Sequence, residues 1–439
     1  MSPVPAQLTL SAFLHPAGQP LAARGPDAHR AGSFDHYRKL AAVAERGLFD
    51  FLFLPDAEGV RPHDDAVISH ASKGFADQFE PFTLLSALST CTEHIGLVAT
   101  ASTSFNEPYH VARKLASLDR LSAGRAGWHV TVAQENFELE NFGPAWTFSR
   151  STRFARAAEF IDVVTGLWRG TQRRRQADEA ALVPIDAEPA RAVALHHRGQ
   201  HFSVRGPLNI LRTPQARPVV ATAVSSGATQ ALALRSADIV FTPQSSLLEA
   251  CDFYADFKAR VQALGRDPAH VRILPDVFAV VGRSEAEARE RFEQLQPSLD
   301  GADGLALLAR CLDANRRGYP LDGPLPPVQD ADPGGRLALV APATYAQMTI
   351  REIYLRIAGS RGHWTLVGTP ASIADELELW FRERGADGFN LVPPNLPDGL
   401  NDFVDLVVPE LQRRGLFRTH YTGATLRDHL GLPKEVGER

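Results

Sequence analysis

Residues 80–132 alternate between helical and strand patterns so closely that few folds can accommodate them. Pro81 begins an apolar helix, and His94–Thr100 is a short run rich in β-branched residues. Pro108–Ser122 has apolar residues at helical spacing, and Ala126–Val132 is a second apolar strand pattern. Strand, helix and strand in such close succession predict a parallel sheet with helices packed outside it.

The same rhythm continues along the 439 residues. Six further strands are predicted at Leu8–Leu14, Phe51–Leu54, Pro218–Ala223, Ala237–Phe241, Val271–Val281 and Gly388–Val392. Helices are predicted at His36–Arg46, Thr152–Trp168, 227–234, Leu247–Leu264, Glu285–Leu295, Pro370–Arg384 and Leu400–Arg414. Two excursions, at about residues 170–214 and 296–365, interrupt the order. They are predicted to hold a hairpin near His201–Val204 and helical pieces near Leu305–Leu312 and Tyr345–Ile357.

Eight strand–helix units favour an α/β fold of one particular kind, the (β/α)8 TIM barrel with insertions. An open doubly wound sheet more often has five or six strands. We therefore expect a single barrel domain over residues 1–439, with its chemistry at the carboxyl ends of the strands.

Composition excludes several classes of function. The net charge of −5 argues against nucleic acid as the main partner. No run approaches the roughly 18 apolar residues of a membrane span, and the N-terminus lacks a signal pattern, so a cytoplasmic protein is expected. Three cysteines without a CxxC pair indicate neither a disulfide framework nor a cysteine zinc site, and Cys91 is predicted in the core. Two histidine-rich loops, at 63–70 and 196–201, lack helical ligand spacing, so no metal site is predicted.

Polar residues at predicted strand ends are the candidates for a cofactor site. The chain lacks the GxGxxG, GxxxxGK[ST], HExxH and GxSxG motifs. Asp56 follows a strand as a cofactor contact or as a loop cap. Thr100 and Ser102 end a strand with small hydroxyls that can face a flavin-like ring, or simply form a polar strand end. His129 interrupts an apolar run, where a hydrogen-bonded core histidine is the commoner case.

A phosphate is the ligand that two other positions suit. Ser225 and Ser226 lie between a strand and a helix, where hydroxyls and backbone N–H groups can bind an anion. An ordinary serine N-cap is the alternative. Arg150 and Arg153 precede a helix and can reach the same phosphate, although most such arginines are surface residues.

Several long segments resemble one family almost end to end. The longest are AERGLFDFLFLPD at 44–56, PYHVARKLASLDRLSAGRAGW at 108–128 and DFVDLVVPELQRRGLFRTHYTGATLRDHLGL at 402–432. In these the chain resembles the two-component flavin monooxygenases of the nitrilotriacetate, dibenzothiophene-sulfone and pristinamycin synthase type. That group belongs to the bacterial luciferase-like superfamily.

The resemblance implies a function as well as a fold. It implies reduced FMN delivered by a separate NAD(P)H-dependent flavin reductase, O2 as co-substrate, and a flavin peroxide that oxidises a small organic molecule. By matching position it implies flavin contacts at Asp56, Thr100 and Ser226. It also implies a homodimer or homotetramer.

The chain departs from the family pattern at the site itself. A His-x-x-x-Tyr pattern becomes Arg150 and Phe154, and the Asn after the family tryptophan becomes His129. Arg150 can still neutralise a phosphate, and His129 can contact the ring or act as an acid or base. The departures leave two further hypotheses open: a flavin- or deazaflavin-dependent hydride-transfer enzyme, and a subunit that binds flavin or a partner without catalysis.

Overall fold

The computed structural model describes residues 7–14, 32–59, 79–133, 138–139, 141–143, 148–170, 193–210, 213–295, 323, 349 and 363–433. Within these ranges eight parallel strands close into a barrel in the order β1, β2, β3, β4, β7, β8, β9 and β11. Their bounds are Thr9–Phe13, Phe51–Leu54, Gly96–Ser102, Ala126–Thr131, Val219–Ala223, Ile239–Thr242, Arg272–Val281 and Gly388–Val392. The predicted TIM barrel is therefore confirmed.

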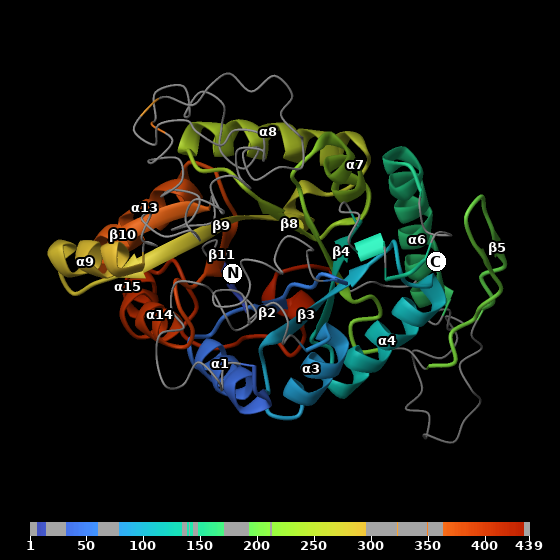
Figure 1. Cartoon of the computed structure of the whole chain (residues 1–439), viewed down its shortest axis with the longest axis horizontal. Coiled ribbons are helices and arrows are strands. Elements are labelled where there is room, and N and C mark those ends of the chain that lie inside the picture. Colours follow the sequence, from blue (N-terminus) through green and yellow to red (C-terminus); the bar gives the residue numbers. More distant parts are fainter. Residues whose placement is uncertain are drawn as a thin grey trace, which may run out of the picture.

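Helices surround the strands, and Figure 1 shows them as an outer ring from α1 through α3, α4, α6, α7 and α8 to α13. The helices are α1 (Phe34–Arg46), α3 (Pro81–Leu88), α4 (Pro108–Leu121), α6 (Arg150–Gly170), α7 (Gly227–Ser236), α8 (Leu247–Ala263), α9 (Glu285–Leu295), α13 (Pro370–Arg382), α14 (Asp398–Asp402), α15 (Val408–Arg413) and α16 (Leu426–His429). A short 3₁₀ helix, Pro268–His270, precedes β9. A two-stranded hairpin, β5 (His197–Arg198) with β6 (Ser203–Val204), lies outside α6 in Figure 1.

Residues alternate between two sides of the barrel wall. One side faces the helices, where Trp128 of β4 packs on Phe160 and Trp168 of α6. The other side faces the barrel lumen. A second buried cluster gathers these lumen residues with the C-terminal leucines: Phe13, Phe51, Phe53, Val98, Val219, Ala221, Ile239, Phe241, Leu274, Leu426, Leu430 and Leu432.

The C-terminal segment closes the end of the barrel at which the strands begin. A Cβ added to Gly96, the first residue of β3, would lie 2.5 Å from the Leu426 side chain. Glycine is therefore required for this close approach. Leucines fill that end, whereas Thr100, Ser102 and His129 lie nearer the carboxyl ends of their strands.

Three details differ from the sequence-based expectations. A ninth strand, β10 (Trp364–Gly368), pairs with the second half of β9, so the second excursion ends before residue 364 rather than at 365. The last long helix contains a turn of π-helix, Phe403–Val407, just before Pro409, which has no N–H to donate. Cys91 is exposed beyond the end of α3, so its core prediction is wrong. The helical pieces predicted within residues 305–357 lie outside the described ranges.

Candidate active site

The barrel brings most of the predicted site residues to neighbouring positions. Asp56 follows β2, Thr100 and Ser102 end β3, His129 lies in β4, and Ser225 follows β7. These four strands are consecutive neighbours in the barrel. Because all of them are parallel, their carboxyl ends lie at one rim. The residues grouped from the sequence therefore lie at the same rim of the barrel.

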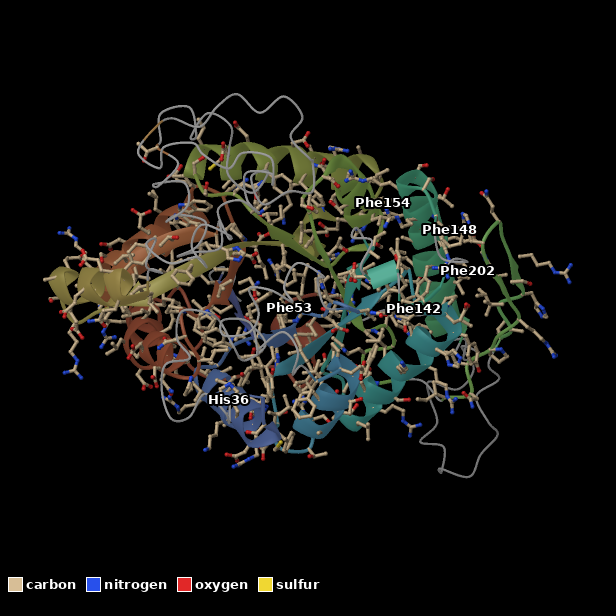
Figure 2. The ribbon with its side chains drawn as sticks, viewed as in Figure 1. His36, Phe53, Phe142, Phe148, Phe154 and Phe202 are labelled. Atoms are coloured by element: carbon tan, nitrogen blue, oxygen red, sulfur yellow. The ribbon has the colours of Figure 1, made fainter. Side chains whose placement is uncertain are left out.

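His129 is buried in the wall of the barrel, beside Thr100. It pairs with Thr100 in the strand register, and its Nδ1 lies 3.1 Å from the Thr100 hydroxyl. Its ring centroid lies 4.7 Å from that of Phe53, which Figure 2 shows near the centre of the barrel, and 5.8 Å from that of Phe241. Burial lowers the pKa of His129 to about 3, so the imidazole is neutral at physiological pH. Nε2 is buried without a hydrogen-bond partner in the described part of the chain.

Ser102 lies two residues beyond Thr100 on the same side of β3, at the rim. Its hydroxyl accepts a hydrogen bond from the backbone N–H of Ser104 at 3.1 Å. The Ser104 hydroxyl in turn accepts from the Ala133 N–H at 3.0 Å. These bonds shape the turn after β3 and hold it against the end of β4, so Ser102 has at least this structural role.

Asp56 belongs to a rim of carboxylates above β2. Its side chain is half-buried, and burial, with Glu80 and Glu138 nearby, raises its pKa to about 6. Burial and Asp56 raise the pKa of Glu58 to about 7, although Asn106 donates to the Glu58 carboxylate at 3.3 Å. Near neutral pH both carboxyl groups therefore change protonation state, and each can donate or accept a hydrogen bond there.

Ser226 is the N-cap of α7. Its hydroxyl accepts from the Thr229 N–H at 3.4 Å, while the Thr229 hydroxyl accepts from the Ser226 N–H at 3.0 Å. The N-cap alternative is thus present in the structure. The first N–H groups of a helix have no intrahelical partner. A Cβ added to Gly227 would meet nothing within 4 Å, so open space lies over this positive helix end. Ser225, just before the cap, is exposed.

Arg150 and Phe154 begin α6, which packs beside α4 and α7. Arg150 is exposed, and Phe154 is half-buried against the main core (Figure 2). Two other arginines of α6 are anchored at the rim. Arg153 donates to the Ala133 carbonyl at 2.7 Å, and Arg156 donates to the Thr103 carbonyl. Arg153 is therefore committed to the backbone of the rim, and Arg150 is the cation with its side chain in solvent.

The opposite wall of the lumen holds a polar group that the sequence analysis missed. Asn390 of β11 donates to the Asp276 carboxylate of β9 at 2.7 Å and accepts from the Ser11 hydroxyl of β1 at 2.7 Å. The other carboxylate oxygen lies 3.3 Å from Nδ1 of His363. Burial raises the pKa of Asp276 to about 7. A carboxylate in the apolar strand Arg272–Val281 was the signal that could have found this group.

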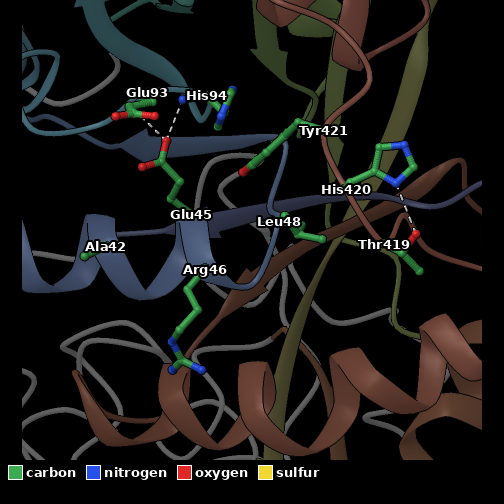
Figure 3. A pocket seen from close by; sticks show the side chains of 9 residues that line it. All are labelled: Ala42, Glu45, Arg46, Leu48, Glu93, His94, Thr419, His420 and Tyr421. Carbon is green, nitrogen blue, oxygen red and sulfur yellow. Dashed lines mark hydrogen bonds between the residues drawn. The ribbon is translucent and has the colours of Figure 1, made fainter.

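A hollow of about 570 Å³ lies at the other end of the barrel (Figure 3). It is bounded by the end of α1, the turn before β3 and residues 419–421. Within it the Glu45 carboxylate accepts from three successive backbone N–H groups, at residues 93, 94 and 95. Because barrel enzymes carry their chemistry at the carboxyl ends of the strands, this hollow is not the candidate active site.

The described residues contain no group of three or more histidine, cysteine, aspartate or glutamate side chains placed to hold a metal ion. None of the helices in these ranges is long and apolar enough to cross a membrane.

The closed parallel barrel is the architecture of the (β/α)8 enzymes, whose active sites lie at the carboxyl rim of the strands. The chain belongs to the luciferase-like monooxygenases, because residues 18–388 match that family. It is a flavin-dependent monooxygenase.

Relatives cover nearly the whole chain. N-acetyl-S-(2-succino)cysteine monooxygenase of Bacillus subtilis is 42% identical over 98% of both chains. Nitrilotriacetate monooxygenase component A of Aminobacter aminovorans is 41% identical over 96% of this chain and 93% of the relative. Among solved structures, EDTA monooxygenase from Chelativorans sp. BNC1 superposes with a TM-score of 0.81 at 30% identity, covering 98% of this chain and 100% of the other.

Proposed function

We propose that this chain binds reduced FMN at the carboxyl rim of its barrel and uses O2 to oxidise a small organic molecule. One observation carries the proposal: the rim of four adjacent strands and α7 combines a buried imidazole acceptor with an open helix N-terminus. A flavin mononucleotide needs such a pair, because it joins a ring with N–H groups to a dianionic phosphate. The similarity to monooxygenases along the whole chain supports the same conclusion.

The residues present fit the parts of FMN. Gly227 and the N–H groups at the start of α7 suit the phosphate. The guanidinium of Arg150, at the start of α6, carries a positive charge that attracts a phosphate. Thr100 and His129 suit the ring, and Asp56 at the rim suits a ring or ribityl donor. Reduced flavin, when bound, would supply the two electrons with which one oxygen atom of O2 enters the product and the other becomes water. The residues of the chain bind and orient the flavin and exclude water from the reaction.

The partners follow from this chemistry. Reduced flavin must be supplied by a second protein, so we place a separate NAD(P)H-dependent flavin reductase beside this chain in the cytoplasm, where NAD(P)H is available. Nitrilotriacetate monooxygenase component A is by its name one component of a larger system, which supports the same division of labour. A homodimer or homotetramer is the oligomeric state we expect.

The test is isotopic. Purified protein is supplied with FMN, NADH, a flavin reductase and ¹⁸O2, and is offered nitrilotriacetate and N-acetyl-S-(2-succino)cysteine among other small thioethers and amines. We expect one ¹⁸O atom in the product of at least one compound. Turnover with a reduced deazaflavin in the absence of O2 would instead support hydride transfer. Failure to bind flavin would support a subunit without catalysis.

The phosphate placement has its own variant pair. Gly227→Asp puts a carboxylate into the open space over α7, where it favours the helix end and repels a phosphate. We expect FMN affinity to fall about tenfold, while riboflavin, which lacks the phosphate, is unaffected. Gly227→Asn is the uncharged control. Equal losses for FMN and riboflavin would remove the phosphate from this position.

A further inference from the structure

The tautomer of His129 follows from its hydrogen bonds. The Thr100 hydroxyl lies 2.7 Å from the Leu54 carbonyl oxygen, which can only accept, so the hydroxyl donates its single hydrogen there. Toward His129, at 3.1 Å, the same oxygen can then only accept. Nδ1 must therefore carry the imidazole hydrogen, and Nε2 is left with a bare lone pair.

The surroundings of His129 disfavour protonation of this lone pair. Phe53 and Phe241 border the ring, and a charged imidazolium would lose its hydration among them. The His129 side chain is 6% exposed, and its Nε2 has no hydrogen-bond partner in the described ranges. His129 is thus an acceptor that does not become a donor, held in a lumen position near the carboxyl ends of the strands.

A buried acceptor without a partner is unfavourable, which makes a ligand N–H the natural partner. The neutral reduced flavin ring carries N–H groups at N1, N3 and N5, and its anion keeps those at N3 and N5. The oxidised ring keeps N3–H but has only a lone pair at N5. An obligate acceptor that faces N5 therefore attracts the reduced ring and repels the oxidised one.

We propose that His129 Nε2 accepts a hydrogen bond from N5–H of reduced FMN and so selects the reduced over the oxidised cofactor. This inference rests on the proposed function, because it requires FMN in the lumen. It assigns His129 a fixed acceptor role in cofactor selection, in place of the acid–base role that its residue type suggests. Selection of this kind lets the chain take reduced flavin and release the oxidised form.

The first test compares affinities for the two redox forms under anaerobic conditions. In His129→Leu, which lacks the acceptor, we expect the ratio of FMNH2 to FMN affinity to fall about tenfold. The same ratio fixes the midpoint potential of bound FMN relative to free FMN, so the expected potential falls by about 30 mV. Thr222→Val is the matched control. It removes a buried hydroxyl from β7 that faces away from the lumen, beside Val130 in the register, and the ratio should stay constant.

Thr100 provides a second, milder test. Thr100→Val removes the acceptor that fixes the Nδ1 hydrogen, so the imidazole can adopt its other tautomer and discrimination should weaken. Thr100→Ser keeps the hydroxyl and should preserve the ratio. Equal ratios in Thr100→Val and wild type would contradict the role of Thr100 in setting the tautomer.

Two outcomes overturn the inference while leaving the proposed function intact. FMNH2 and FMN affinities that fall equally in His129→Leu would place Nε2 against N3–H or against no ring donor. In protein labelled with ¹⁵N-histidine, a protonated Nε2 between pH 5 and 8 would refute the acceptor itself, without any variant or cofactor. If wild-type protein binds neither flavin form, the proposed function fails instead.

Discussion

Two walls of the barrel lumen carry polar groups whose pKa values are shifted in opposite directions. On β3 and β4, Thr100 and His129 form a neutral pair, because burial lowers the His129 pKa to about 3. On β9, β11 and β1, Asp276 is held by Asn390 and His363, and burial raises its pKa to about 7. One wall therefore offers a fixed acceptor, and the other offers a carboxylate that gains or loses a proton near physiological pH.

The difference arises from the partners available on each wall. Among the described residues, His129 has two aromatic rings and one hydroxyl as neighbours, and none of these stabilises an added charge. Asp276 receives a hydrogen bond from an amide and faces a second imidazole. Desolvation disfavours the charged form on both walls, and it acts in opposite directions on a base and on an acid.

The largest effect is expected from Asn390→Leu. The substitution leaves the Asp276 carboxylate and the Ser11 hydroxyl without their shared partner, so we expect a loss of about 3 kcal/mol in unfolding free energy at pH 8. The loss should be smaller at pH 5.5, where Asp276 is protonated. Chemical denaturation at the two pH values measures it. A loss independent of pH would show that Asn390 does not stabilise the ionised carboxylate.

A second prediction concerns the acid limb of the stability profile. The unfolded chain protonates His129 below its ordinary pKa of 6.5, while the folded chain resists protonation down to about 3. Stability is therefore lost as pH falls from 6.5 toward 3. Relative to wild type, His129→Leu should lose about 2 kcal/mol less between pH 7 and 5. Identical slopes would mean that His129 titrates normally in the folded protein, and the contrast between the walls would disappear.

The smallest effect is expected from Asp276→Asn, and it has the opposite sign. The folded chain holds the Asp276 proton up to about pH 7, whereas the unfolded chain releases it near 3.8. Wild-type stability therefore decreases as pH rises through this window. The variant escapes that decrease and should gain about 1 kcal/mol relative to wild type between pH 6 and 7. A relative loss over the same interval would show that His363 keeps Asp276 ionised through their contact.

The polar residues of the β3–β4 wall could be grouped from the sequence, whereas those of the β9–β11–β1 wall could not. Thr100 and His129 belong to strands that follow one another in the chain, so their shared rim could be predicted from the strand order. Asp276, Asn390 and Ser11 come together only because the barrel closes β9 and β11 onto β1, across most of the chain. Each is a polar residue in an apolar run, as His129 is, but only closure makes them neighbours.

The remaining predictions depend on whether a contact is local in sequence or is set by tertiary packing. The serine cap of α7, which the sequence offers as the alternative interpretation of Ser226, is present, because capping depends on residues three positions apart. The anchoring of Arg153 to the Ala133 carbonyl depends on how α6 meets the end of β4, which no local pattern specifies. The assignments of Asp56, Thr100, Ser102, Arg150, Phe154, Ser225 and Ser226 to a flavin stay predictions.

The most direct measurement is a crystal structure of the anaerobic complex with FMNH2. The account predicts the flavin ring at the carboxyl rim with N5 against Nε2 of His129, and the phosphate over Gly227 at the start of α7. A flavin in the hollow beside Tyr421, or at the rim with its phosphate turned away from α7 and its N5 away from His129, would contradict it.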